Sequence, residues 1–190
     1  RGFPGGVVVA ALVFVAGCGA APAAPPAVPV TTAPTALTPP PVVAPAEPAA
    51  VAIPSIGVRS DLLHLGLAAD GSAEVPADYA LAGWFREGGR PGGRGPTVLL
   101  GHVDSRDGPA VFYRLRDLSP GDAIEVATGD GSVARYAVDR VEQVPKDEFP
   151  TFEVFGATRD DVLRLVTCAG DFDRGERSYT DNLVVHATRL

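Results

Sequence analysis

The chain has 190 residues, of which 46% are hydrophobic and 21% charged, and its formal net charge is -7. This length and apolar content fit one globular domain with an appendage. The negative charge and the lack of a basic run exclude a nucleic-acid-binding surface, because such surfaces need clustered Lys and Arg. The glycine-rich residues 88–95 lack the Lys-Ser/Thr of a phosphate-binding loop, so no nucleotide site is expected there.

Residues 1–24 are typical of the leader of an exported protein. An apolar run of about a dozen residues follows the charged Arg1, which is short for a membrane span of about 20 residues. The segment Val15-Ala16-Gly17-Cys18 resembles a bacterial lipobox. Cys18 is therefore either a lipidation site or a residue of an uncleaved anchor. Both alternatives predict a protein held at the extracytoplasmic face of a bacterial cell membrane.

Residues 25–50 are rich in Ala, Pro, Val and Thr. Ten of the 19 prolines lie between Pro22 and Pro48. Such a composition favours extended polyproline conformations and cannot bury a core. It predicts a semi-rigid tether between the leader and a folded domain that spans residues 51–190.

The segment 51–190 alternates short β-like runs with turns rich in Gly, Pro and Asp. Strands are expected at 50–53, 58–62, 97–102, 123–127, 133–144, 162–167 and 183–188. Asp130-Gly131 between two of these runs is a strong hairpin signal. Helical turns are expected only near residues 110–115 and 159–161. The pattern predicts a mainly β fold, either a barrel or a sandwich.

Two residues suited to catalysis each come at the end of an apolar, strand-like run. Cys168 follows residues 162–167, and His102 follows residues 98–101. Each has a structural alternative, because a lone Cys often packs as a small hydrophobe and a lone His is often satisfied in a core. For His64 and His186, which lie within apolar runs, the structural interpretation is preferred.

Together, a thiol and an imidazole can perform acyl transfer. The thiolate attacks a carbonyl, the imidazolium protonates the leaving amine, and the acyl-enzyme waits for a second nucleophile. The oxyanion formed on the way needs a donor. Arg174 and Arg177, which follow Cys168 in the chain, are the candidates for this role; each could equally be a solvated surface charge.

The motifs around these residues resemble those of the sortase family, most closely the actinobacterial class F sortases. Leu165-Val166-Thr167-Cys168 resembles the strand end that carries the sortase cysteine. Residues 99–105 and 108–112 resemble the family's histidine segment. Further matches follow the family order at 53–58, 84–85 and 181–187. The resemblance covers approximately residues 51–190.

The resemblance implies an all-β fold, a closed barrel of about eight strands with short helices in its loops. It implies that Cys168 is the nucleophile and His102 the general acid/base. The expected reaction cleaves a C-terminal Leu-Pro-x-Thr-Gly-like sorting signal of a secreted protein through a thioacyl-enzyme. The acyl group then passes to an amine, such as that of a peptidoglycan precursor, or to water.

The arginine of the family is the part of the pattern that this chain matches less well. Sortases place it at or just before the last strand, where residues 178–182 contain no Arg. Arg177 is the preferred candidate because it is nearer to that strand, and Arg174 is the alternative.

Two other functions fit parts of the sequence. A different cysteine enzyme, of the L,D-transpeptidase type, would also pair Cys and His, but its Ser-His-Gly-Cys-like motif is absent. A non-catalytic surface lipoprotein or binding module would explain Cys18 and the tether. No cofactor or metal is expected, because the His and Cys residues lack zinc-ligand spacing and no EF-hand pattern occurs. Residues 144–145, 149–150 and 152 could line an apolar substrate groove or pack in the core.

Overall fold

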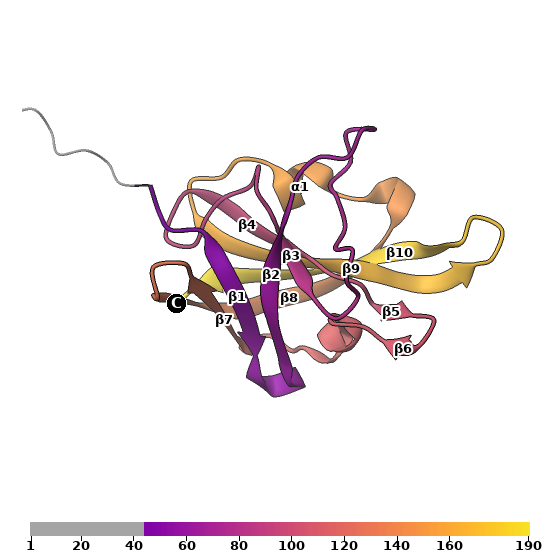
Figure 1. Cartoon of the computed structure of the whole chain (residues 1–190), viewed down its shortest axis with the longest axis horizontal. Coiled ribbons are helices and arrows are strands. Elements are labelled where there is room, and N and C mark those ends of the chain that lie inside the picture. The colour runs from indigo at the N-terminus through magenta and orange to yellow at the C-terminus, as the bar shows by residue number, and fades with distance from the viewer. Residues whose placement is uncertain (1–43) are drawn as a thin grey trace, which may run out of the picture. The chain divides into compact units, whose positions relative to one another are not determined.

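The structure is a computed structural model that describes residues 44–190. The expected leader and the expected tether as far as residue 43 lie outside the described residues. Eight strands form a closed barrel in the order β1-β2-β3-β4-β9-β10-β8-β7, as Figure 1 shows in part. The expectation of a mainly β, sortase-like closed barrel with few short helices is therefore confirmed.

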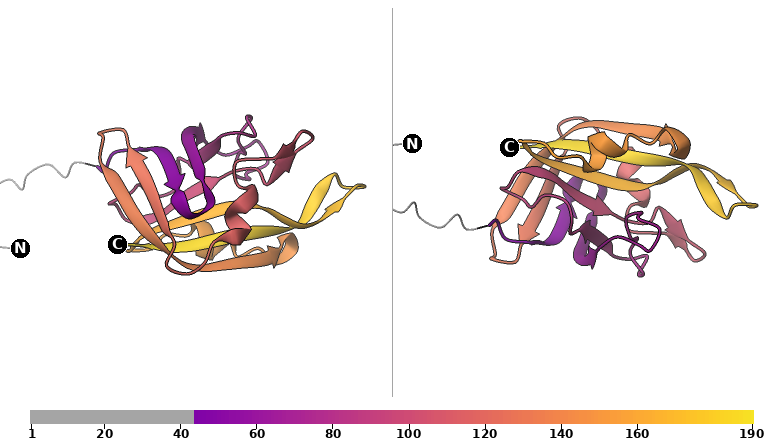
Figure 2. Two further views of the ribbon diagram at one scale, coloured as in Figure 1. Left: turned by 90° about the horizontal axis from the view of Figure 1, so that it is seen from below. Right: turned by 90° about the horizontal axis from the view of Figure 1, so that it is seen from above.

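The barrel strands are β1 (Pro48–Ile53), β2 (Val58–Leu65), β3 (Ala82–Phe85), β4 (Gly95–Leu100), β7 (Ala123–Thr128), β8 (Val133–Pro145), β9 (Asp161–Asp173) and β10 (Ser178–Arg189). A small hairpin follows β4 and consists of β5 (Asp104–Ser105) and β6 (Gly108–Pro109). The helical turns are η1 (Pro54–Ile56), η2 (Tyr113–Asp117), η3 (Lys146–Glu148) and α1 (Thr151–Phe155). In the two views of Figure 2, the β9–β10 hairpin extends beyond the barrel on the side away from the C-terminus.

Most neighbouring strands are antiparallel, but β4 pairs with β9 in parallel. Their register runs from Gly95 opposite Asp161 to Leu100 opposite Val166. The carboxyl ends of parallel neighbours meet at the same edge of a sheet. β4 therefore ends at Leu100, beside Val166, while β9 continues to Cys168 and beyond. The residues that follow β4 thus lie near Cys168.

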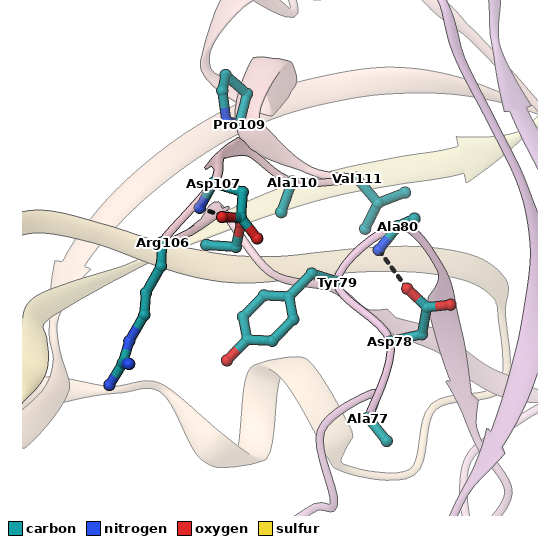
Figure 3. A pocket seen from close by; sticks show the side chains of 10 residues that line it. Ala77, Asp78, Tyr79, Ala80, Arg106, Asp107, Pro109, Ala110 and Val111 are labelled. Atoms are coloured by element: carbon teal, nitrogen blue, oxygen red, sulfur yellow. Dashed lines mark hydrogen bonds between the residues drawn. The ribbon is translucent and has the colours of Figure 1, made fainter.

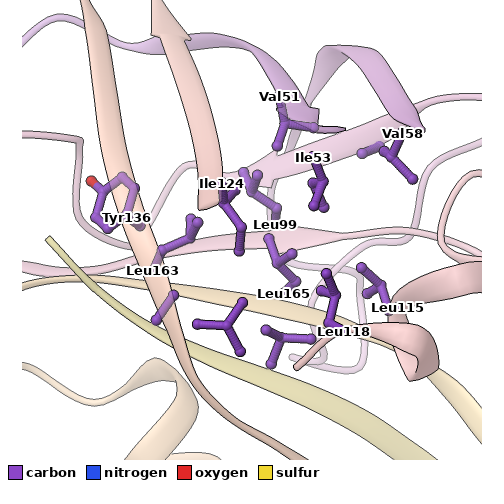
Figure 4. Close-up of a cluster of buried hydrophobic side chains, with 14 of the residues drawn as sticks. Val51, Ile53, Val58, Leu99, Leu115, Leu118, Ile124, Tyr136, Leu163 and Leu165 are labelled. Carbon is purple, nitrogen blue, oxygen red and sulfur yellow. The ribbon is translucent and has the colours of Figure 1, made fainter. Parts of the chain in front are cut away.

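The barrel interior holds the larger of two apolar clusters, part of which is drawn in Figure 4. On β9, Leu163 and Leu165 point into this cluster, whereas Val166 belongs to a second cluster on the outer face. The segment from η3 through α1 covers that outer face with Phe149, Val154 and others. Because both faces of β9 are covered, apolar residues point to both sides of the strand rather than alternating with polar ones, and Arg164 is the one charged residue among residues 162–167.

Several features of the fold differ from the sequence-based expectation: besides β3 and α1, the turns η1 and η3 and the β5–β6 hairpin were not expected. The strand β3 was not expected, because its four residues lie between turn-rich segments and are too few to show a period. They pair in parallel with β2 and antiparallel with β4. The helical turn expected at 159–161 is wrong: Asp161 begins β9, where its carboxylate accepts hydrogen bonds from the Tyr136 hydroxyl and the Gly92 amide, both at 2.8 Å. The helix lies earlier, at Thr151–Phe155.

The N-terminal edge of the barrel includes residues just before the expected domain. β1 begins at Pro48, and Glu47 pairs with Arg90 at 2.7 Å. Within residues 44–190, no helix has both the length and the apolar character needed to cross a bilayer.

Candidate active site

The structure brings Cys168 and His102 to one cavity. The last pair in the parallel β4–β9 register is Leu100 with Val166, and each candidate lies two residues further along its own chain. Both side chains line a cavity of about 620 Å³. Other residues that line it are Tyr79, Asp104, Arg106, Phe172, Arg177 and Tyr179. The parallel pairing is thus the structural cause of the thiol–imidazole juxtaposition.

Cys168 is a free, half-buried thiol on β9. Burial raises the pKa of the thiol, the Lys146 ammonium opposes this rise, and the Asp104 carboxylate adds to it. Burial and a nearby negative charge both disfavour a thiolate, and a nearby positive charge favours it. The resting thiol is therefore protonated at neutral pH and needs a base before it can attack.

His102 is held in place through its edge, its face and its backbone. Its Nε2 lies 2.8 Å from the carbonyl oxygen of Pro76, which can only accept a hydrogen bond, so Nε2 carries a proton. Its ring is stacked on that of Tyr79, with centroids 4.2 Å apart and an interplanar angle of 28°. Its carbonyl accepts a hydrogen bond from the Phe112 amide at 3.0 Å. In the neutral ring, Nδ1 is therefore the nitrogen that can accept a proton.

Asp104 and Tyr179 connect the histidine segment to the β9–β10 hairpin. The Tyr179 hydroxyl donates a hydrogen bond to the Asp104 carboxylate. This bond, with burial and the charge of Asp104, raises the pKa of Tyr179 to about 12. The Tyr179 phenol therefore stays protonated at neutral pH and can donate to Asp104.

The two candidate arginines differ in where they lie. Arg177 sits in the turn between β9 and β10 with a φ of 50°, and it lines the cavity of Cys168 and His102. Arg174, in the same turn, is exposed and does not line this cavity. The structure therefore brings Arg177, but not Arg174, to the candidate site.

Several further residues at the site escaped the sequence analysis. Lys146 is the only lysine of the chain, and its Nζ donates to Ser178 Oγ at 2.6 Å beside Cys168. Asp104 lies two residues after His102, and this proximity could have identified it as a residue of the site. Tyr79 lies in the long connection between β2 and β3, where no periodic pattern points to it. Its approach to His102 depends on tertiary structure.

A second cavity, of about 940 Å³, is lined by the residues drawn in Figure 3. Tyr79, Ser105 and Arg106 line both cavities. The second cavity continues between the residues before β3 and the β5–β6 hairpin. Tyr79 is thus part of the wall between two open spaces.

The apolar residues expected near a substrate groove have different environments. Val144 and Phe149 pack against the outer-face cluster that contains Val166, two residues before Cys168 on the same face of β9. Phe152, on α1, is 81% exposed. In residues 44–190, no group of three or more His, Cys, Asp or Glu side chains is arranged to hold a metal ion.

The closed barrel presents a free thiol and an imidazole in one cavity, and these are the two groups that cysteine acyl transfer requires. A sequence model of the sortase domain matches residues 51–190. The chain therefore belongs to the sortase family, whose members are cysteine transpeptidases. A search of curated proteins found no match.

Solved sortases have a similar fold. Sortase A from Corynebacterium diphtheriae, as a lid mutant, is 22% identical with a TM-score of 0.59, and the match covers 75% of this chain and 69% of that one. Sortase C-1 from Actinomyces oris is 22% identical with a TM-score of 0.57, covering 74% and 72%. A sortase D5 transpeptidase from Clostridium perfringens is 20% identical with a TM-score of 0.56, covering 76% and 79%. At these identities, the similarity concerns the fold.

Proposed function

We propose that this sortase-family protein cleaves a C-terminal sorting signal of the Leu-Pro-x-Thr-Gly kind and transfers the acyl group to an amine. Cys168 is the nucleophile and His102 the general acid/base. The observation that carries the proposal is the parallel β4–β9 register, which leads both side chains to one cavity. The acceptor is the amine of a peptidoglycan precursor or a similar group, with water as the competing nucleophile.

The protons move between the thiol, the imidazole and the substrate. His102 Nδ1 takes the thiol proton as the sulfur attacks the scissile carbonyl, because Nε2–H is already donated to Pro76. The resulting imidazolium then protonates the leaving amine, and a thioester remains on Cys168. In the second half-reaction, His102 removes a proton from the incoming amine as that amine attacks the thioester. The free thiol is then regenerated.

The oxyanion of each tetrahedral intermediate requires a positive or hydrogen-bonding group. We assign this role to Arg177, because it lines the cavity of Cys168 and His102. Arg174 is the alternative that follows from the sequence alone.

The apolar part of the signal would bind along the outer face of the barrel. Cys168 shares that face of β9 with Val166, and Val144 and Phe149 continue the apolar surface from the β8–β9 connection. Exposed Phe152 lies on the same connection. This surface suits the Leu-Pro side chains, because small-peptide sites combine apolar walls with few polar groups.

We further propose a class F sortase at the extracytoplasmic face of a bacterial membrane. The class rests on the sequence motifs around His102 and Cys168. The location rests on residues 1–24, which have the pattern of a leader, an anchor or a lipidated Cys18. The tether expected at residues 25–50 would join them to the catalytic domain expected at 51–190, and its last three residues belong to β1. The partners are then secreted proteins that carry sorting signals.

The test is turnover of a fluorogenic Leu-Pro-x-Thr-Gly peptide with an added amine. We expect the full chain to release the fluorophore and to form the amine adduct, detected by mass spectrometry. Cys168→Ala should lose both products, and a thioester adduct should form on wild type only. Equal turnover by wild type and Cys168→Ala would exclude the proposal. No turnover with an inert thiol would favour a non-catalytic surface protein.

A further inference from the structure

The segment between β2 and β3 contacts His102 twice, although the two are distant in sequence. The Pro76 carbonyl accepts the Nε2 proton at 2.8 Å, and the Tyr79 ring lies against the imidazole face at a centroid distance of 4.2 Å. The first contact fixes the direction of the ring edge, and the second fixes the ring plane. Together they restrict both side-chain torsions of His102.

The backbone of Tyr79 is itself anchored. Its carbonyl accepts a hydrogen bond from the Val111 amide at 3.0 Å. The neighbouring Asp78 carboxylate accepts one from the Ala80 amide at 2.8 Å, which Figure 3 marks. Phe112, the residue after Val111, donates its amide to the His102 carbonyl at 3.0 Å. The backbones of Tyr79 and His102 are thus both hydrogen-bonded to the same short segment, residues 111–112.

The ring of Tyr79, rather than its hydroxyl, makes the contact with His102. The residue is 49% exposed, so its ring covers the imidazole from the solvent side. Within residues 44–190, its hydroxyl has no hydrogen-bond partner. In Figure 3 the ring extends toward the Arg106 side of the larger cavity. The hydroxyl can therefore be removed without loss of a hydrogen bond within residues 44–190.

We propose that Tyr79 is a positioning residue for His102: its ring holds the imidazole plane so that Nδ1 stays directed to the site while Pro76 keeps the proton on Nε2. This inference rests on the proposed role of His102 as general acid/base. Without the stack, the imidazole rotates away from its hydrogen bond and the two tautomers mix. A small misplacement of a catalytic group costs up to about 100-fold in rate.

The kinetic test compares Tyr79→Ala with Tyr79→Phe in the full chain. We expect Tyr79→Ala to lower kcat about 10-fold or more, with KM for the peptide within about 2-fold, because the ring acts on the acid/base and not on the peptide. Tyr79→Phe keeps the ring and should stay within about 2-fold of wild type in both constants. An unchanged kcat in Tyr79→Ala overturns the inference. Equal loss in both variants also overturns it, because the hydroxyl would then be the active part.

A spectroscopic test keeps this inference separate from the proposed function. The imidazole ¹⁵N shifts of His102, assigned with His102→Gln, should show Nε2 protonated and Nδ1 bare in wild type and in Tyr79→Phe at a pH where the ring is neutral. In Tyr79→Ala they should move toward a mixture of tautomers. Unchanged shifts in Tyr79→Ala overturn the inference even if activity falls. If no protein turns over peptide but the shifts change as expected, the proposed function fails while the positioning role stands.

Discussion

Two side chains of opposite charge act on the Cys168 thiol from different elements. Lys146 follows β8 and favours the thiolate, whereas Asp104 follows β4 and disfavours it. The net result, with burial, is a raised pKa of the thiol. A thiol that stays protonated until a base acts reacts more slowly with oxidants and alkylating agents than a thiolate does.

The first prediction concerns this charge balance. Asp104→Asn removes a group that raises the pKa of Cys168, so the pKa should fall. Lys146→Gln removes the group that lowers it, so the pKa should rise further. The rate of iodoacetamide alkylation as a function of pH measures both, because only the thiolate reacts. At pH 7 we expect Asp104→Asn to react faster than wild type and Lys146→Gln to react more slowly.

A control is available for this experiment. Glu87→Gln changes an exposed carboxylate that does not line the Cys168 cavity and should leave the alkylation profile unchanged. If both site variants moved the profile in the same direction, the electrostatic explanation would be wrong.

The second prediction separates the two arginines. Arg177→Ala should lower kcat/KM by about 100-fold, the loss typical of one oxyanion donor. Arg174→Ala, in the same turn but outside the cavity, should stay within about 3-fold of wild type. Steady-state kinetics with the fluorogenic peptide measures both. The reverse order of effects would transfer the role to Arg174.

At the scale of elements, the end of β9 depends on a glycine. Gly170, two residues after Cys168, has a φ of 80°, and a Cβ there would lie 2.4 Å from Thr180 Oγ1 and 2.8 Å from Asp181 Cγ. The β9–β10 register also shifts between Tyr179 and Asp181. The positive φ and the close approach of β10 both require glycine at this point.

The third prediction compares this glycine with one in an open turn. Gly131, between β7 and β8, has a similar φ of 85° but no atom within 4 Å of an added Cβ. Gly131→Ala should therefore lower the free energy of unfolding by about 1–2 kcal/mol from backbone strain alone. Gly170→Ala adds a steric clash and should cost about 1 kcal/mol more, with reduced turnover. Urea denaturation measures both, and equal losses would show that β10 accommodates the methyl group.

At the scale of the whole molecule, a buried histidine lies where α1 covers the barrel. His186 on β10 is 1% exposed, and across the sheet it faces Arg140 on β8 and Arg164 on β9. The carboxylates of Glu142 and Glu153 lie 3.4 Å and 3.8 Å from its ring nitrogens. Burial lowers the pKa of His186 to about 4. The two arginines also lower this pKa, whereas the two carboxylates raise it.

The fourth prediction follows from the lowered pKa. Because the unfolded chain has an ordinary histidine pKa of about 6.5, it binds the proton first as the pH falls. The contribution of neutral His186 to the free energy of unfolding is complete above about pH 6.5. It is lost as the pH falls toward 4, and the loss amounts to at most about 3 kcal/mol. Urea denaturation at pH 7, 5.5 and 4.5 measures the loss.

The matched variants are His186→Gln and His64→Gln. We expect the pH dependence to flatten in His186→Gln, because no proton can bind there. The side chain of His64 is 52% exposed, and His64→Gln should keep the wild-type dependence. The same slope in all three proteins would mean that other groups cause the loss.

The sequence by itself determined a mainly β fold and most of its strands, and its resemblance to sortases implied the closed barrel. It also singled out Cys168 and His102 as candidates for acyl-transfer chemistry. Runs such as 162–167 are rich in Val and Leu because β9 is covered on both faces, so they can be identified as strands without coordinates. The hairpin turn at Asp130-Gly131 depends on local sequence only and was predicted equally well. The four-residue β3 and the position of α1 could not be predicted from the sequence, because such short elements take their conformation from their neighbours.

Only the tertiary structure decided how the site is assembled. The parallel pairing of β4 with β9 joins residues 66 positions apart, and no local pattern encodes that register. The same applies to Tyr79 against His102, Lys146 near Cys168, and Arg177 rather than Arg174 in the cavity. Local sequence sets strand and turn propensities over a few residues. Contacts between distant segments depend on which strands become neighbours when the barrel closes. These contacts set the charge and geometry around the thiol.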